Sequence, residues 1–370
     1  MKKGLWIWVI IGVVVIGGIV WWQIKSEVGR KEVLNVGAIL PLTGKAARYG
    51  EEMRRGIDLA LEDSKGVQVR VFYEDSKFDT KEGVSAYYKL RNVNHISAVI
   101  TAVSPIALAI SPLANRDKVL QMAIAASTPK YTSPEDFTFR VTPRAEVEDR
   151  ELVRFVVPRY KRIGLLYINN EWGLGHRNSI IPEIRSLGGM VVGEETFSPQ
   201  EVDFRAQLTK LKEKSPEAIF LLARAKTAGI VLKQARELGI KAQFFGIRSL
   251  QSKDLISIAG EAAEGVIYTY PFNPQSSSPR VRTFVERYKA KYNEIPTSYV
   301  AEGYDALKLI VKAFKDCGKV DTECMKEDLL RTKNYPGILG NLTFDRNGDV
   351  YFPYFIKTVK NGEFVEYKGK

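Results

Sequence analysis

The chain has 370 residues, of which 45% are apolar and 26% charged, which is typical of a folded globular protein. Its 55 basic and 43 acidic residues give a net charge of +12 without an obvious run of Lys or Arg. Such a surplus favours anionic surroundings such as lipid head groups and is no nucleic-acid signature. Two cysteines and two histidines argue against a disulfide scaffold, a multi-cysteine metal site and a zinc enzyme.

The N-terminal segment, residues 1–32, has the features of a membrane anchor or a signal segment. Residues 5–22 carry no charge. At about 1.5 Å per residue, a helix of this length nearly crosses a hydrocarbon core of roughly 30 Å. Tryptophans at both ends suit the head-group zone, and two preceding lysines place the N-terminus in the cytoplasm. A cleaved signal peptide is the alternative, but bulky Trp21 and Trp22 stand where a small-residue cleavage site would follow. We therefore expect a membrane anchor through residues 5–24, with the body in the periplasm or outside the cell.

From residue 33, short apolar runs alternate with helical patterns, and the series occurs twice. The first series predicts strands at 33–39, 69–75, 97–103 and 119–125. The second predicts strands at 162–168, 190–197, 218–223, 243–247 and 265–272. Helical patterns separate them at 49–63, from about 80, from about 105, up to 186, at 203–213 and up to 238. Because strands that alternate with helices form parallel sheets, we expect an α/β fold with two doubly wound parallel-sheet lobes.

The remainder of the chain breaks this alternation. Residues 279–292, 298–315 and 322–331 predict helices, and residues 273–279, NPQSSSP, resemble a linker. Residues 341–350 and 351–367 then predict antiparallel strands, with turns at Asn347-Gly348 and Asn361-Gly362.

Ligand sites in open parallel sheets lie beyond the carboxyl ends of the strands, where helix N-termini offer unpaired N–H groups. Ser104, Ser127 and Thr128 occupy such loops, and each hydroxyl can either face a ligand or act as an ordinary N-cap. Tyr49 and Trp172 each precede a glycine in corresponding loops of the two lobes. As a facing pair they can close on a small ligand, whereas alone each is more often part of the packing.

The sequence contains no recognisable catalytic constellation. It has no GxSxG, GxGxxG or Walker motif, so we expect neither an enzyme nor a bound cofactor or metal. His176, near the start of a helix, is interpreted as a surface residue or a polar contact. Cys317 and Cys324 stand seven residues apart, and outside the membrane they form either a local disulfide or two reduced thiols.

Six stretches, none diagnostic alone, stand in a specific order and spacing along the body. They are VGAILPLTGKAARYGEEMRRGIDLALED, SPIALAISPLA, AASTPKYT, LKQARELGIKAQFFG, IAGEAAEGV and TFDRNGD. Together they make residues 33–368 resemble the periplasmic binding proteins of branched-chain amino-acid transport. The resemblance implies two lobes joined by three crossovers near Thr142, 269–272 and 342–344, with the ligand bound in the cleft by hinge closure. Lobe 1 would then contain residues 33–142 and 273–341, and lobe 2 residues 143–272 and 342–370.

The resemblance also implies site residues. In the amino-acid binders of that family, first-lobe hydroxyls and backbone N–H groups hold the ligand carboxylate. The matching positions in this chain are Ser104, Ala126, Ser127 and Thr128. Tyr49 and Trp172 match the aromatic walls of the cleft.

One position departs from the family pattern. Two positions after the glycine that follows the strand at 243–245, the amino-acid binders place an acidic residue that faces the ligand ammonium. Arg248 occupies that position here, and Arg224 stands near a second ligand-facing position. A fixed cation at roughly 4 Å would repel an ammonium group by a few kcal/mol and would pair bidentately with a carboxylate. The sequence therefore favours an organic acid, a dicarboxylate or an aromatic carboxylate. If Arg248 turns outward or pairs with an acid such as Asp75, an ordinary amino-acid site remains.

These features predict an extracytoplasmic solute-binding protein, a monomer that captures a small polar ligand and presents it to the permease of an ABC importer. A ligand-sensing ectodomain of the same fold is the alternative. Its cytoplasmic stub of about four residues is too short for a signalling domain, so a receptor would need a partner chain across the membrane.

Overall fold

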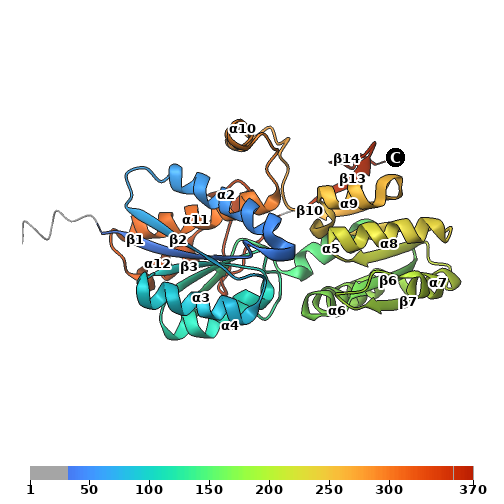
Figure 1. Cartoon of the computed structure of the whole chain (residues 1–370), viewed down its shortest axis with the longest axis horizontal. Coiled ribbons are helices and arrows are strands. Elements are labelled where there is room, and N and C mark those ends of the chain that lie inside the picture. The colour runs from blue at the N-terminus through green and yellow to red at the C-terminus, as the bar shows by residue number, and fades with distance from the viewer. Residues whose placement is uncertain (1–31, 353, 370) are drawn as a thin grey trace, which may run out of the picture.

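The computed structural model describes residues 32–352 and 354–369, which form two large sheets at opposite ends of the long axis of the molecule (Figure 1). The predicted membrane anchor at residues 5–24 lies outside the described residues. Across residues 32–352 and 354–369, no helix combines the length and the apolar character that a membrane crossing needs.

The first sheet has five parallel strands in the order β2-β1-β3-β4-β5. Its strands are β1 (Leu34–Leu40), β2 (Val69–Asp75), β3 (Ala98–Ala102), β4 (Leu120–Ile124) and β5 (Thr138–Arg140). Strands β3 and β4 are buried along their whole length, which explains their continuous apolar runs. Helices on the two faces are α2 (Ala47–Glu62) and α11 (Ser298–Cys317), opposite α3 (Thr80–Val93) and α4 (Ser104–Arg116) (Figure 1).

The second sheet has seven strands in the order β14-β13-β10-β9-β8-β6-β7. Its parallel strands are β6 (Arg162–Ile168), β7 (Met190–Phe197), β8 (Ala218–Leu222), β9 (Gln243–Gly246) and β10 (Ile267–Tyr270). Its antiparallel edge is the hairpin of β13 (Phe355–Lys360) and β14 (Glu363–Glu366). The covering helices are α5 (Ala145–Val156) and α6 (Glu171–Ser186) on one face, and α7 (Arg205–Glu213), α8 (Ala225–Glu237) and α9 (Lys253–Ala259) on the other.

The α/β architecture with two sheet-centred lobes is confirmed, and every strand predicted in the two alternating series is present. The second sheet is mixed rather than wholly parallel, because the C-terminal hairpin extends its edge beside β10. The predicted turn at Asn361-Gly362 joins β13 to β14, and both residues have positive φ values, 53° and 72°. The sequence did not predict β5, α5 or α9.

The chain passes between the two sheets three times. The first passage lies between β5 and α5, and the second between β10 and α10 (Pro279–Tyr292). The third lies later than the predicted 342–344, because the Gly348 carbonyl still accepts a hydrogen bond from the Arg140 N–H of β5 at 3.1 Å. Residues 341–350 form little strand: β12 (Asn341–Leu342) pairs with β11 (Tyr335–Pro336), and Phe344 bridges Val350.

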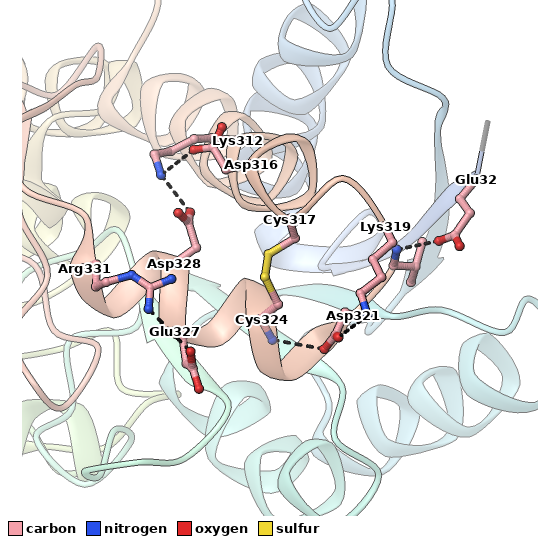
Figure 2. The surroundings of a disulfide bond; sticks show 11 residues. Glu32, Lys312, Asp316, Cys317, Lys319, Asp321, Cys324, Glu327, Asp328 and Arg331 are labelled. Atoms are coloured by element: carbon pink, nitrogen blue, oxygen red, sulfur yellow. Dashed lines mark hydrogen bonds and ion pairs between the residues drawn. A yellow bond between two sulfur atoms is a disulfide. The ribbon is translucent and has the colours of Figure 1, made fainter. Parts of the chain in front are cut away.

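A disulfide joins Cys317 to Cys324 and closes the loop between α11 and α12 (Thr322–Arg331), with 6.1 Å between the Cα atoms (Figure 2). Two hydrogen bonds also hold this loop in place. The Cys324 N–H donates to Asp321 at the start of α12, at 3.1 Å, and the Val320 N–H donates to the Glu32 carboxylate at 2.5 Å. The loop that the disulfide closes is therefore also hydrogen-bonded to Glu32, where the described part of the chain begins.

Candidate functional site

A cavity of about 280 Å³ lies between the two lobes, close to the lower limit of roughly 300 Å³ for small-molecule sites. Its lining includes the loops that follow strands β1, β3, β4, β6, β8 and β9 at their carboxyl ends. Open parallel sheets bind their ligands at this edge. Apart from Tyr49, Trp172 and Tyr299, the apolar part of the lining consists of Pro41, Ala46, Met53, Phe78, Val103, Pro105, Ala125 and Ile247.

Most of the residues nominated by the sequence border this cavity. Those that line it are Tyr49, Ser104, Ser127, Trp172, Arg224 and Arg248. Ala126 and Thr128 are not among the lining residues. Their carbonyl oxygens accept hydrogen bonds from the buried Arg140 guanidinium at 2.9 and 2.8 Å. Ala125, the neighbour of Ala126, lines the cavity instead.

The first-lobe side of the cavity offers two hydroxyl groups and a helix N-terminus. Ser104 is the first residue of α4, and its Oγ accepts a hydrogen bond from the Thr128 N–H at 3.4 Å. Ser127 follows β4 and is 4% exposed. Val103 and Ala125, close to the two serines, have φ values of 65° and 52°, which are uncommon for residues other than glycine. The two hydroxyl groups and the positive end of a helix dipole suit an anionic ligand group.

Aromatic rings border the cavity from both lobes. Tyr49, in the first turn of α2, makes an edge contact with Tyr299 of α11 at 5.2 Å between ring centroids. Burial raises the pKa of the Tyr49 hydroxyl, although the nearby Arg224 guanidinium acts to lower it. In the second lobe, Trp172 of α6 stands edge-on to His176 at 4.9 Å. The predicted pair of Tyr49 and Trp172 thus comes from opposite lobes, and Tyr299 adds an aromatic residue that the sequence did not single out.

Arg248 is not the free cation that the sequence suggested. It begins the short 3₁₀ turn after β9, is 7% exposed, and its guanidinium pairs with the fully buried Glu302 carboxylate of α11. Its backbone N–H donates to Glu148 Oε1 at 2.9 Å. Asp75, the expected alternative partner, instead accepts from the Leu42 N–H at 2.8 Å. Arg248 is therefore paired with an acid, the alternative that the sequence left open, although the acid is Glu302 and not Asp75.

Glu302 ties the two lobes together beneath the cavity. Besides the Arg248 guanidinium, its carboxylate accepts the Ala125 N–H at 2.7 Å and the Thr142 hydroxyl at 2.6 Å. Thr142 lies in the first passage between the sheets. Burial acts to lower the pKa of Arg248, but the Glu302 carboxylate, together with Tyr299, Tyr354 and Glu148, holds that pKa above the usual value. A single buried carboxylate therefore joins the cavity floor, the hinge passage and the second lobe.

His176 is a buried polar contact, which is one of the two roles that the sequence allowed. It is 1% exposed, and its Nδ1 lies 2.7 Å from Asp149 Oδ1. The ring lines the cavity, and its Nε2 has no hydrogen-bond partner in the described part of the chain. Burial raises the pKa of Asp149 to about 6. Burial acts to lower the pKa of His176, but the adjacent carboxylate prevails and raises it.

Two contacts join the lobes at the rim of the cavity. The exposed Arg224 guanidinium lies over the Phe78 ring at 4.5 Å from its centroid. The Lys130 ammonium lies 3.4 Å from the Glu171 carboxylate. Arg224 is thus present in the lining as predicted, but it lies over an aromatic ring of the opposite lobe.

The order of strands, the three passages and the interlobe cavity agree with the resemblance seen in the sequence. A family model described as "Periplasmic binding protein" matches residues 33–363. The chain belongs to the periplasmic binding protein family.

Relatives of this periplasmic binding protein place it in the branched-chain amino-acid type. The leucine-, isoleucine-, valine-, threonine- and alanine-binding protein of Pseudomonas aeruginosa is 25% identical, over 91% of this chain and 90% of the relative. The structure of the leucine-binding protein LivK from Thermotoga maritima is 28% identical with a TM-score of 0.84, covering 90% of this chain and 98% of that one. LivJ of Streptococcus pneumoniae, solved with isoleucine, is 26% identical with a TM-score of 0.83 and the same coverage.

Two buried carboxylates at the site of this binding protein gave no sequence signal for a site. Glu148 lies in an unpredicted helix, α5, whose first two turns are rich in acidic residues and look solvated. Glu302 lies in the long helix α11, which also contains Asp305 and Asp316, so one more acidic residue there is unremarkable in sequence. Only their burial, 1% and 0% exposed, and their hydrogen-bond partners distinguish them from surface carboxylates. Glu148 lines the cavity itself, whereas Glu302 acts through Arg248.

Proposed function

We propose that this periplasmic binding protein captures a small amino acid with an apolar side chain in the interlobe cavity and delivers it to the permease of an ABC importer. The observation that carries the proposal is the cavity itself. It is about 280 Å³, places two hydroxyls and the α4 N-terminus on the first lobe, and is otherwise lined largely by apolar and aromatic groups. Such a lining suits a ligand with one carboxylate and an apolar body.

The printed ligands of the relatives support the same class. The Pseudomonas relative is named for leucine, isoleucine, valine, threonine and alanine, and the Streptococcus structure contains isoleucine. The ligand that Arg248 first favoured, an organic or aromatic acid without an ammonium group, loses its main support. Since the guanidinium is paired with Glu302, a ligand carboxylate there would have to displace a buried internal partner.

Binding is proposed to proceed by closure of the lobes about the three passages. Tyr49, Ser104 and Ser127 would meet the ligand from the first lobe, and Trp172 from the second. Arg224 and Phe78 would then cover the opening. One chain supplies both walls of the cavity, so the proposed working unit is a monomer, and no catalytic role is assigned to any residue.

The position of the protein at a membrane is a separate part of the proposal. Residues 5–24 are proposed to remain as an anchor that keeps the body outside the membrane and near the permease. N-terminal sequencing of the protein extracted from cell membranes is expected to start at or near Met1. A start after residue 24 would show that the segment is removed.

The ligand class can be tested by thermal unfolding in the presence of a panel of compounds. Leucine, isoleucine, valine, threonine and alanine would be compared with benzoate, succinate and other acids that lack an ammonium group. A ligand at 100 times its dissociation constant adds about 2.7 kcal/mol to the free energy of unfolding, which is readily seen as a raised melting temperature. Stabilisation by one or more amino acids supports the proposal, and stabilisation only by the acids overturns it.

A further inference from the structure

Buried charges around the cavity do not balance. The carboxylates of Glu148, Asp149 and Glu302 are 1%, 0% and 0% exposed, and the cationic groups buried among them are Arg248 and His176, 7% and 1% exposed. If His176 is protonated, the cluster still carries one excess negative charge, and if it is neutral the excess is two. Arg224 does not correct this, because it is exposed and lies over the Phe78 ring at the rim.

The ion pairs within this cluster assign the excess negative charge to one residue. Arg248 is paired with Glu302, and His176 with Asp149 at 2.7 Å. Glu148 receives only neutral donors, the Arg248 backbone N–H at 2.9 Å and the Thr269 hydroxyl at 2.8 Å. Both of these hydrogen bonds end on Oε1, and in the described part of the chain Oε2 has no partner.

Glu148 also lies where a ligand can reach it. It lines the cavity from α5 on the second lobe, whereas the hydroxyls of Ser104 and Ser127 line it from the first lobe. A buried carboxylate without a counter-ion is costly, and a cation that enters the cavity would relieve that cost. The first-lobe hydroxyls and helix N-terminus suit an anion, so the two sides of the cavity are complementary to the two ends of a zwitterion.

We propose that Glu148 receives the ammonium group of the ligand through Oε2, and that it thereby selects α-amino acids over acids of the same carbon skeleton. This inference rests on the proposed function and names the residue that discriminates within it. A zwitterion held at one end by lobe 1 and at the other by Glu148 of lobe 2 also links ligand capture to closure.

The test compares matched ligands and matched variants by calorimetric titration of the full chain in a mild detergent. The probes are leucine, isoleucine, valine, threonine and alanine, each beside the carboxylic acid with hydrogen in place of the amino group. In Glu148→Gln, the amide carbonyl can keep both hydrogen bonds of Oε1 while the charge is lost. The control is Glu146→Gln on the same helix, since Glu146 is ion-paired with Arg144 at 2.9 Å and is absent from the cavity lining.

We expect the unaltered protein and Glu146→Gln to bind at least one amino acid and to prefer it strongly over its deaminated partner. Glu148→Gln should bind that amino acid about 100-fold more weakly, with little change for the deaminated acid, because truncation of a buried charge pair has effects of this order. Glu148→Asp, which keeps the charge on a shorter stem, should lose less affinity than Glu148→Gln. Far-ultraviolet circular dichroism would establish that each variant is folded.

The outcomes separate the two proposals. If an amino acid binds the unaltered protein and Glu148→Gln equally well, the role of Glu148 is refuted and the proposed function stands. A Glu148→Gln variant that loses the amino acid and the deaminated acid in equal measure also refutes it, because the loss is then unrelated to the ammonium. If no amino acid binds the unaltered protein, the proposed function and the role of Glu148 fail together.

Discussion

Replacing Glu302 with glutamine should destabilise the protein far more than the loss of an ordinary ion pair. The Glu302 carboxylate is completely buried and accepts hydrogen bonds from the Ala125 N–H, the Thr142 hydroxyl and the Arg248 guanidinium. Glutamine keeps one acceptor oxygen but leaves the 7% exposed Arg248 without its counter-ion. The change therefore leaves a buried guanidinium without its ion-pair partner at the floor of the cleft.

The size of the effect follows from burial. Two unit charges about 4 Å apart attract each other by about 4 kcal/mol at an effective dielectric constant near 20. Breaking a buried pair by removing one partner typically costs about 3–5 kcal/mol. With an unfolding entropy of roughly 2.1 cal/mol/K per residue, a body of about 340 residues would melt about 4–7 °C lower.

Urea unfolding of residues 32–370, followed by circular dichroism, would measure this loss. The matched control is Glu261→Gln, which removes an ion pair with Arg236 whose side chains are 84% and 59% exposed and which should change the free energy of unfolding by about 0–1 kcal/mol. In a double-mutant cycle, Arg248→Met combined with Glu302→Gln should cost much less than the sum of the two single changes. A loss in Glu302→Gln no larger than in the control would show that Arg248 and Glu302 are not paired in a dry interior.

Further predictions concern a buried acid, the disulfide and the cleft tryptophan. Burial raises the pKa of Asp305 to about 7, although two backbone N–H donors act to lower it, so the folded state holds a proton that the unfolded chain releases near pH 4. As the pH rises from about 4 to about 7, the free energy of unfolding should therefore fall by up to about 1.4 kcal/mol per pH unit. This slope should diminish in Asp305→Asn. Replacing Cys317 and Cys324 together with serine should cost about 2–3 kcal/mol, from the entropy of the small loop that the bridge closes. Trp172 is the only tryptophan after residue 22, so its fluorescence in residues 32–370 should change when an amino acid binds.

Each of these has a result that would contradict it. An equal pH slope in Asp305→Asn and the unaltered protein would assign the slope to other groups. A serine double variant as stable as the oxidised protein, or unaltered protein indifferent to a reducing agent, would remove the stabilising role of the bridge. Unchanged Trp172 emission with an amino acid that raises the melting temperature would place that ligand away from the cleft wall.

The strand series could be predicted because each strand is a short apolar run bounded by turn residues. Residues 69–75, 162–168 and 190–197 correspond to β2, β6 and β7 without any shift of their ends. Helix α5 could not be predicted with the same ease, because Glu148 and Asp149 interrupt its apolar face. Both are buried by partners that lie far away in sequence, namely Thr269 and His176. Local pattern alone does not reveal such partners.

The candidate site was predictable as a set of loops and less so as a set of contacts. The rule that ligands lie beyond the carboxyl ends of parallel strands selected Ser104 and Ser127, and both line the cavity. It could not show that Ala125 rather than Ala126 faces the cavity, because neighbouring loop residues point in different directions. Nor could it show that Arg248 is paired, since Glu302 is 54 residues away and belongs to the other lobe. A guanidinium that looks unpaired in the sequence is therefore ion-paired in the folded protein.

The most direct test of the account is a crystal structure of residues 32–370 with the amino acid that stabilises the protein most. The account predicts that the ligand lies in the interlobe cavity, with its carboxylate at Ser104 and Ser127, its ammonium at Glu148 and its side chain near Trp172. A ligand found outside this cavity, for example in the groove on the other side of the hinge that Arg144 and Arg280 help to line, would contradict it.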